Sequence, residues 1–190
     1  MNALVNTVNT IDTTIREALT HPTMDIKTYG MTKAVIETGS DPKEYPAVLT
    51  TDNEIQAAID DNFSICTWHK VRSQNVTAVE DGFGDEDNDK ASETSMSLLV
   101  WGNLNRLQIN ETQLANLIHY TIPSVVNVGI NGVYSTSVDV TSVNYESKAI
   151  FEREFQGVSY NLDIGSTIIQ IDYSINMQFN KSCVAQCTTC

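Results

Sequence analysis

The longest regular pattern in the chain is an alternation of apolar and polar side chains near its C-terminal end. Between residues 169 and 179 every odd position is apolar and every even position is polar. A side-chain period of two is typical of a β-strand with one buried face and one wet face. At about 3.3 Å per residue the strand would span roughly 36 Å, about twice the usual length. The pattern predicts one long, two-faced strand, whose polar row includes Gln170, Asp172, Asn176 and Gln178.

Two other segments follow the helical period. Apolar residues in the segment 2–19 recur at spacings of four and three, which places them on one stripe of a helix and turns Asp12 away from it; they are Leu4, Val8, Ile11, Ile15 and Ala18. A second helix is expected between Asn110, a good N-cap, and Pro123, which ends it. A third, shorter helix is expected within residues 145–155, with Ile150, Phe151 and Phe155 inward.

The remaining apolar segments are short and separated by turn residues. We expect strands near residues 32–36, 46–51, 54–59, 63–71, 94–101 and 125–143. In the segment 94–101 both alternating rows are apolar, which indicates a central strand covered on both sides. The predicted fold class is therefore α+β: an antiparallel, strand-dominated sheet with two or three helices on one face.

Length and composition indicate one folded domain. The chain has 190 residues, of which 41% are hydrophobic, enough to bury a core without metal or disulfide staples. We divide it into a single α+β domain over residues 1–180 and a cysteine-containing tail over residues 181–190. Residues 79–94 hold seven acidic side chains and one lysine. Self-repulsion in such a segment favours an extended chain, so we predict an acidic hairpin or loop insertion near residues 72–95.

The net charge of −13 disfavours specific binding to nucleic acid. Such binding needs clustered basic side chains, and the longest basic group is Lys70-Val71-Arg72. An acidic wall would instead let DNA slide past without gripping it. No apolar run approaches the roughly 18 residues of a membrane helix, and the N-terminal segment lacks the pattern of a secretory signal. We therefore expect synthesis in a cytoplasm and no membrane partner.

Motifs that would carry catalysis are not found in the sequence. The three histidines form neither a His-x3-His pair nor a His-Glu-x-x-His motif, and no Gly-x-Ser-x-Gly is present. We therefore expect no catalytic residues and no cofactor.

Two segments suggest metal binding, each with a simpler explanation. Asp85, Asp87 and Asp89 alternate as in a calcium loop, but Lys90 stands where the turn glycine belongs, which favours a solvated loop. The tail offers three ligands where zinc usually takes four, so a free tail is the simpler interpretation and a metal clip or intersubunit disulfide the alternative. The three ligands are Cys183, Cys187 and Cys190.

The order of elements resembles that of small neck and tail-completion proteins of tailed bacteriophages, which have a tail-terminator-like fold, and is similar to ring proteins of crAss-like phages. The resemblance covers about residues 1–180. It rests on the opening helix ALVNTVNTIDTTIREAL, on YPAVLTT followed by FSICTWHKV, on SMSLLVWGNLNRL followed by a helix, and on the final alternating strand. The acidic insertion and the cysteine tail depart from the simpler family pattern.

The resemblance implies a structural virion protein without catalytic residues. Such a protein forms a homo-oligomeric ring in the neck, joins portal to tail beside other ring proteins, and surrounds the channel through which DNA leaves. The candidate interface residues are then the polar row of the long strand, Gln170, Asp172, Asn176 and Gln178, together with Asp85 and Asp87 of the acidic loop. The alternative function is a metal- or ligand-binding module that uses the acidic loop or the cysteine tail.

Overall fold

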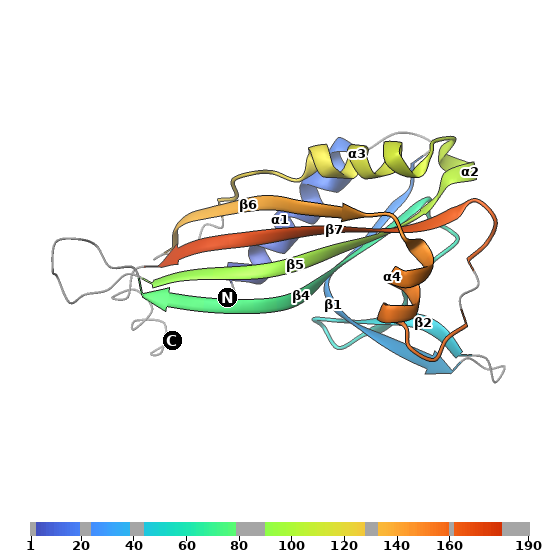
Figure 1. Cartoon of the computed structure of the whole chain (residues 1–190), viewed down its shortest axis with the longest axis horizontal. Helices are drawn as coiled ribbons and strands as arrows, with labels where there is room; N and C mark the ends of the chain where they lie inside the picture. Colours follow the sequence, from blue (N-terminus) through green and yellow to red (C-terminus); the bar gives the residue numbers. More distant parts are fainter. Residues whose placement is uncertain are drawn as a thin grey trace, which may run out of the picture.

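A seven-stranded sheet forms the centre of the molecule, and helices lie on both of its faces (Figure 1). The computed structural model describes residues 3–19, 24–38, 44–78, 90–127, 133–159 and 162–179. The elements in chain order are α1 (Ala3–Ala18), β1 (Ile26–Thr38), β2 (Glu44–Thr50), β3 (Ile55–Ala57), β4 (Ile65–Ala78), β5 (Lys90–Asn103), α2 (Leu104–Leu107), α3 (Glu111–Thr121), β6 (Val133–Asn144), α4 (Ser147–Glu154) and β7 (Ser166–Phe179).

The strand order across the sheet is β3-β2-β1-β4-β5-β7-β6. Neighbouring strands are antiparallel throughout, except for the parallel pair of β1 and β4. This confirms the predicted α+β, strand-dominated and mainly antiparallel fold. None of the helices in the described ranges combines the length and the apolar character needed to cross a membrane.

Four long strands, β4, β5, β7 and β6, form what we call the slab. β5 and β7 pair over their whole length, from Lys90↔Phe179 to Asn103↔Ser166, without a register shift. The long two-faced strand predicted near the end of the chain is therefore confirmed as β7. β4 and β5 form the predicted hairpin, and they stay paired as far as Ala78↔Lys90. Much of the predicted 72–95 insertion is thus regular strand, and its acidic residues 79–89 lie outside the described residues.

The first strand is longer than predicted. A short strand was expected near residues 32–36 because Gly30 reads as turn punctuation, yet β1 runs through this glycine. Gly30 has a φ of 69° and lies at a register shift between Thr28 and Met31, so it bends the strand without ending it. The bend lets the first half of β1 pair with β4 and the second half pair with β2.

One side of the slab, which we call the helical face, packs under α1 and α3. Four residues of the predicted α1 stripe, the buried residues of α3 and the apolar row of β7 form one core. The fifth stripe residue, Ala18, is exposed, and Leu19 is buried instead. The members of this core on β7 are Ile169, Ile171, Tyr173, Ile175 and Met177, all buried. The apolar row of the long strand therefore lies beneath these two helices. α3 begins at Asn110 with a capping box completed by Gln113, as its N-cap signal indicated.

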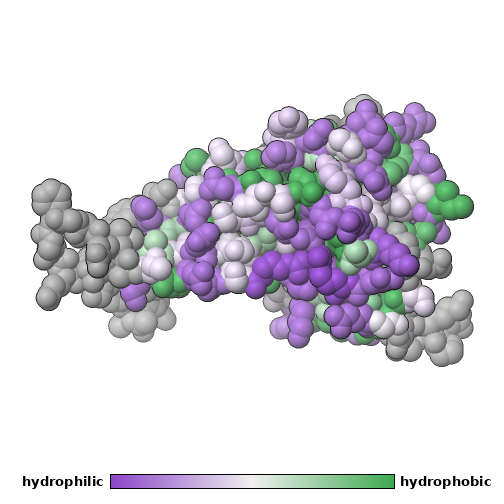
Figure 2. Space-filling model, viewed as in Figure 1, coloured by the Kyte–Doolittle hydropathy of each residue, from purple (hydrophilic) through white to green (hydrophobic). Residues whose placement is uncertain are grey.

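The opposite side of the slab, which we call the open face, carries α4 at one end only (Figure 1). There Trp68, Leu99, Trp101 and Ile168 pack against buried Ile150, Phe151 and Phe155 in a second core. The central strand β5 is therefore covered on both sides, as predicted. α1 and α3 share one face, whereas α4 lies on the other, because β5 presents large apolar side chains there that need a cover of their own. Figure 2 shows polar side chains gathered over this side of the molecule.

Candidate functional site

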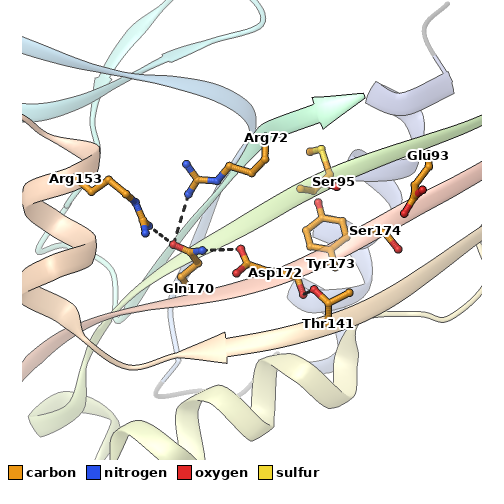
Figure 3. Close-up of a pocket in the computed structure, with 10 residues that line it drawn as sticks. Arg72, Glu93, Ser95, Thr141, Arg153, Gln170, Asp172, Tyr173 and Ser174 are labelled. Atoms are coloured by element: carbon orange, nitrogen blue, oxygen red, sulfur yellow. Dashed lines mark hydrogen bonds between the residues drawn. The ribbon is translucent and has the colours of Figure 1, made fainter. Parts of the chain in front are cut away.

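A polar hollow of about 450 Å³ lies on the open face where the cover of α4 ends. Figure 3 shows that its side chains come from all four strands of the slab and from α4. The residues that line it are Arg72 of β4, Glu93, Ser95 and Met96 of β5, Thr141 of β6, Arg153 of α4, and Gln170, Asp172, Tyr173 and Ser174 of β7. Met96 and Tyr173 are also members of the core on the helical face. The hollow is thus a junction between the apolar end of the open face and its wet end.

A buried carboxylate anchors the α4 side of this hollow. The side chain of Glu154 is fully buried, and it binds three cations: Lys70 Nζ at 2.6 Å, Arg72 Nη2 at 2.8 Å and Arg153 Nε at 3.0 Å. Burial by itself raises the pKa of Glu154, but hydrogen bonds from Lys70 and Arg72, with the charge of Arg72, outweigh it and hold the pKa below its ordinary value. Glu154 therefore stays ionised and fixes the end of α4 to β4.

Gln170 connects the cations to the rest of the slab. Its Oε1 accepts hydrogen bonds from Arg153 and, at 3.5 Å, from Arg72 Nη2, while its Nε2 donates to Asp172 Oδ1 at 2.6 Å. Asp172 Oδ1 also accepts from Ser97 Oγ, and its Oδ2 accepts from Ser142 Oγ at 2.9 Å. One continuous network therefore joins β4, β5, β7, β6 and α4.

The charges around the hollow balance each other. Three basic groups, Lys70, Arg72 and Arg153, face the carboxylates of Glu154 and Asp172, with Glu93 farther along β5. A polar network with its members paired holds a fold in one arrangement, because breaking any bond leaves a desolvated partner behind. The arrangement is thus suited to holding α4 and the four strands rigidly together.

The solvent exposure of the predicted interface residues increases along β7. Gln170 is only 6% exposed, and Asp172 is half-buried within the network. Asn176 is half-buried and donates to Asp139 Oδ2 at 3.2 Å, while Gln178 is exposed. The structure thus brings Gln170 and Asp172 together and leaves Asn176 and Gln178 toward the far end of the strand.

Sequence reasoning missed Arg72, Arg153 and Glu154. A signal for Glu154 was present, because it falls on the same helical side as Phe151 and Phe155, where a charge needs a buried partner. Two of its three partners, Lys70 and Arg72, come from β4, more than 80 residues earlier in the chain. Nothing local to either segment indicates that they meet.

A second buried polar group lies on the helical face. His69 of β4 contacts Asp12 Oδ1 through Nε2 at 3.0 Å and the hydroxyl of Tyr173 through Nδ1 at 2.6 Å. The expectation that Asp12 faces away from the core was wrong, since it is 3% exposed. It is buried because His69 offers it a partner there. Burial, with the charge of Asp12, raises the pKa of Tyr173 well above its ordinary value, so the hydroxyl remains protonated.

The candidate metal ligands of the sequence are not among the described residues. In the ranges the structure covers, no group of three or more His, Cys, Asp or Glu side chains is placed to hold a metal ion. Asp85, Asp87, Cys183, Cys187 and Cys190 lie outside the described residues, so the metal-binding alternative stays a prediction.

Comparison with known proteins adds no relative to this picture. No protein-family model matches the chain, and a search of curated proteins returns no match. We therefore infer the function from the slab, its two faces and the network beneath α4.

Proposed function

We propose that this chain is a structural subunit of a homo-oligomeric ring in the neck or tail of a tailed bacteriophage. It would be made in the host cytoplasm and incorporated into the virion. There the ring joins the portal to the tail, contacts the portal and other ring proteins, and surrounds the channel through which DNA leaves. In this role the subunit carries out no reaction.

The observation that carries the proposal is the far end of the slab. Figure 1 shows the long strands continuing past the helices, toward the Ala78↔Lys90 end of the β4–β5 pair. On the open face this end presents short polar side chains, among them Ser73, Asn75, Ser95 and Ser174. Over residues 73–78 the only described strand that pairs with β4 is β5, and an open, wet edge of this kind is a hazard for a monomer and an asset for a subunit that is completed by its neighbours.

Two further features support the proposal. The hydrogen-bond network at Glu154 and Gln170 makes the slab rigid, which suits a part that must transmit contacts around a ring. The net charge of −13 suits a channel wall past which DNA must move without being held.

The test is the size of the purified full-length protein, measured by mass photometry at micromolar concentration and by negative-stain electron microscopy. We expect closed rings of one size and no binding of duplex DNA at physiological salt. A protein that stays monomeric alone and when co-expressed with the portal and neck proteins of its own genome, and that is missing from purified virions by mass spectrometry, would contradict the proposal.

A further inference from the structure

One edge of the slab is open along the outer half of β4. β1 pairs with β4 only from Ile26↔Ile65 to Met31↔His69. Beyond that point β5 is the only strand paired with β4 among the described residues, and all seven side chains over residues 71–77 are exposed. Natural edges are usually blunted by charges, prolines or bulges, yet residues 73–78 contain none of these.

The other edge of the slab is open along a different part of β6. The outer side of β6 is occupied near its middle, where Val126 N donates to Thr136 O and Val138 N donates to Ser124 O. From Asp139 to Asn144 its only strand partner in the described ranges is β7. This segment, which carries the charged Asp139 and a register shift between Val140 and Ser142, is the second open edge.

The two open edges are offset along the slab. Ser73 pairs with Ser95, Ser95 with Ser174, and Ser174 with Asp139, so Ser73 and Asp139 lie at the same level. The open part of β4 continues from this level away from α4, whereas the open part of β6 continues from it toward α4. A neighbour that used both edges would therefore be displaced along the strands.

We propose that the open edge of β4 in one copy pairs with the open edge of β6 in the next copy, so that the sheet continues from subunit to subunit. This inference rests on the proposed ring and names the contact that closes it. Because the four strands of the slab alternate in direction, a head-to-tail copy presents β4 antiparallel to β6. One contact type then satisfies both edges, and repeated rotation closes the ring.

We place the register so that Asn75 faces Thr141, which is a shift of about four residues, or roughly 13 Å, from the level pairing of Ser73 with Asp139. In this register the two open edges overlap over most of their length. A stagger of this kind tilts the strands against the ring axis, as in closed barrels.

The side chains agree with this register. It places Val76, which is 60% exposed on the helical face, beside Val140 on the same face of the neighbour. It also brings exposed Glu146, just past β6, toward Lys70 and Arg72 of β4. A register shifted by one residue would turn Val76 and the residue that faces it to opposite faces of the sheet. The match of faces covers Val140 and Asp139, because the register shift between Val140 and Ser142 reverses the faces of the residues that follow it in β6. Shape, polarity and charge therefore favour a second copy of this chain as the occupant of each edge.

Cysteine cross-linking tests the contact directly. In a full-length background with Cys183, Cys187 and Cys190 changed to Ser, we would combine Asn75→Cys with Thr141→Cys. Mild oxidation should give a ladder of disulfide-linked species ending at the size of the ring, because facing strand residues lie within disulfide reach. The pair Ser73→Cys with Asp139→Cys tests the level register, and each single variant tests pairing between like edges.

The outcomes separate this inference from the proposed function. Rings that form without a cross-link in the Asn75–Thr141 variant would overturn the edge pairing and leave the ring proposal standing. Dimers cross-linked in a single-cysteine variant, or a ladder only in the level pair, would overturn the proposed partner edge or the register. A chain that forms no ring, alone or with its neck partners, would remove both proposals.

A charge variant provides a second test. Glu146→Lys should raise the protein concentration needed for half-assembly by about tenfold at low salt, because it sets like charges together, and added salt should reduce the effect. Glu146 makes no side-chain cap to α4, so thermal unfolding should change little. Glu146→Gln is the matched control and should lie between wild type and Glu146→Lys. Equal assembly of all three proteins at low salt would contradict the predicted contact.

Discussion

The two faces of β7 are built from alternate residues of one strand, but different interactions stabilise them. On the helical face Ile169, Ile171 and Ile175 are fully buried beneath helices, and non-directional apolar burial holds them there. On the open face the row changes along the strand, from buried Ile168 and Gln170 to exposed Gln178. Alternation alone therefore specifies the helical face, whereas burial on the open face also depends on the side chains of α4 that pack against it.

The largest effect should come from breaking the helical face. Ile171→Asp places an unpaired carboxylate in the core, which costs about 5 kcal/mol or more and is comparable with the whole stability of a domain. We expect the variant to be unfolded or insoluble, as circular dichroism and thermal melts would show. Ile171→Val, which removes one methylene, should cost about 1 kcal/mol and stay folded. A folded Ile171→Asp protein would contradict the assignment of this face.

The next effect should come from the covered end of the open face. Glu154→Gln removes the charge that three cations share, and we expect a loss of about 2 kcal/mol at neutral pH. The estimate is below that for a fully buried pair because Lys70, Arg72 and Arg153 remain 29–45% exposed. Urea unfolding monitored by tryptophan fluorescence measures the difference. Glu152→Gln, at an exposed position on the same helix, is the control and should change stability by less than about 0.5 kcal/mol.

The pH dependence gives this prediction a sign. The folded-state pKa of Glu154 lies below its unfolded value of about 4.3, so its contribution is complete above that value and is lost as pH falls through the lower folded pKa. The stability difference between wild type and Glu154→Gln should therefore shrink on acidification. If the stability difference between the two proteins stays constant from neutral pH to below the folded pKa, the charge of Glu154 does not contribute to stability.

A smaller effect should follow from Gln170→Ala. The side chain is buried and bonds to Arg72, Arg153 and Asp172, so its removal leaves those groups short of partners and should cost about 1–2 kcal/mol. The alternation alone places Gln170 and Asn176 in the same polar row and does not distinguish them. The structure separates the two residues, and denaturant unfolding of both alanine variants would measure the separation.

The elements that sequence reasoning predicted well are those whose period is complete in one segment. α1, α3 and β7 each repeat their apolar residues often enough to define a face without outside help. The parallel pairing of β1 with β4 and the burial of Asp12 depend on contacts between distant segments, so the local pattern gave no sign of them.

The residues of the candidate site also fall into two groups, those that the sequence pattern predicted and those that it missed. Gln170 and Asp172 were named because they belong to a regular row, and they do lie in the hollow. Arg72 and Arg153, which bond to Gln170, and Glu154, which binds both arginines, were not named, because they belong to other segments and meet the row only in the folded chain. A row of side chains on one strand can therefore be predicted from its sequence period, but the residues of other elements that contact the row cannot.

The smallest effect on stability should come from the wet end of the row, at Asn176→Ala. Its one described side-chain hydrogen bond reaches exposed Asp139, and such surface bonds contribute little, so unfolding should change by less than about 0.5 kcal/mol. Assembly is the property that this end of the slab should control. We would measure the size of the assemblies formed by Asn176→Ala, Gln178→Ala and Gln170→Ala. Residues that act between subunits should alter assembly without altering stability, whereas residues that act within a subunit should alter stability. If Asn176→Ala instead destabilises the monomer as much as Gln170→Ala does, then the far end of the open face belongs to the fold and not to a subunit contact.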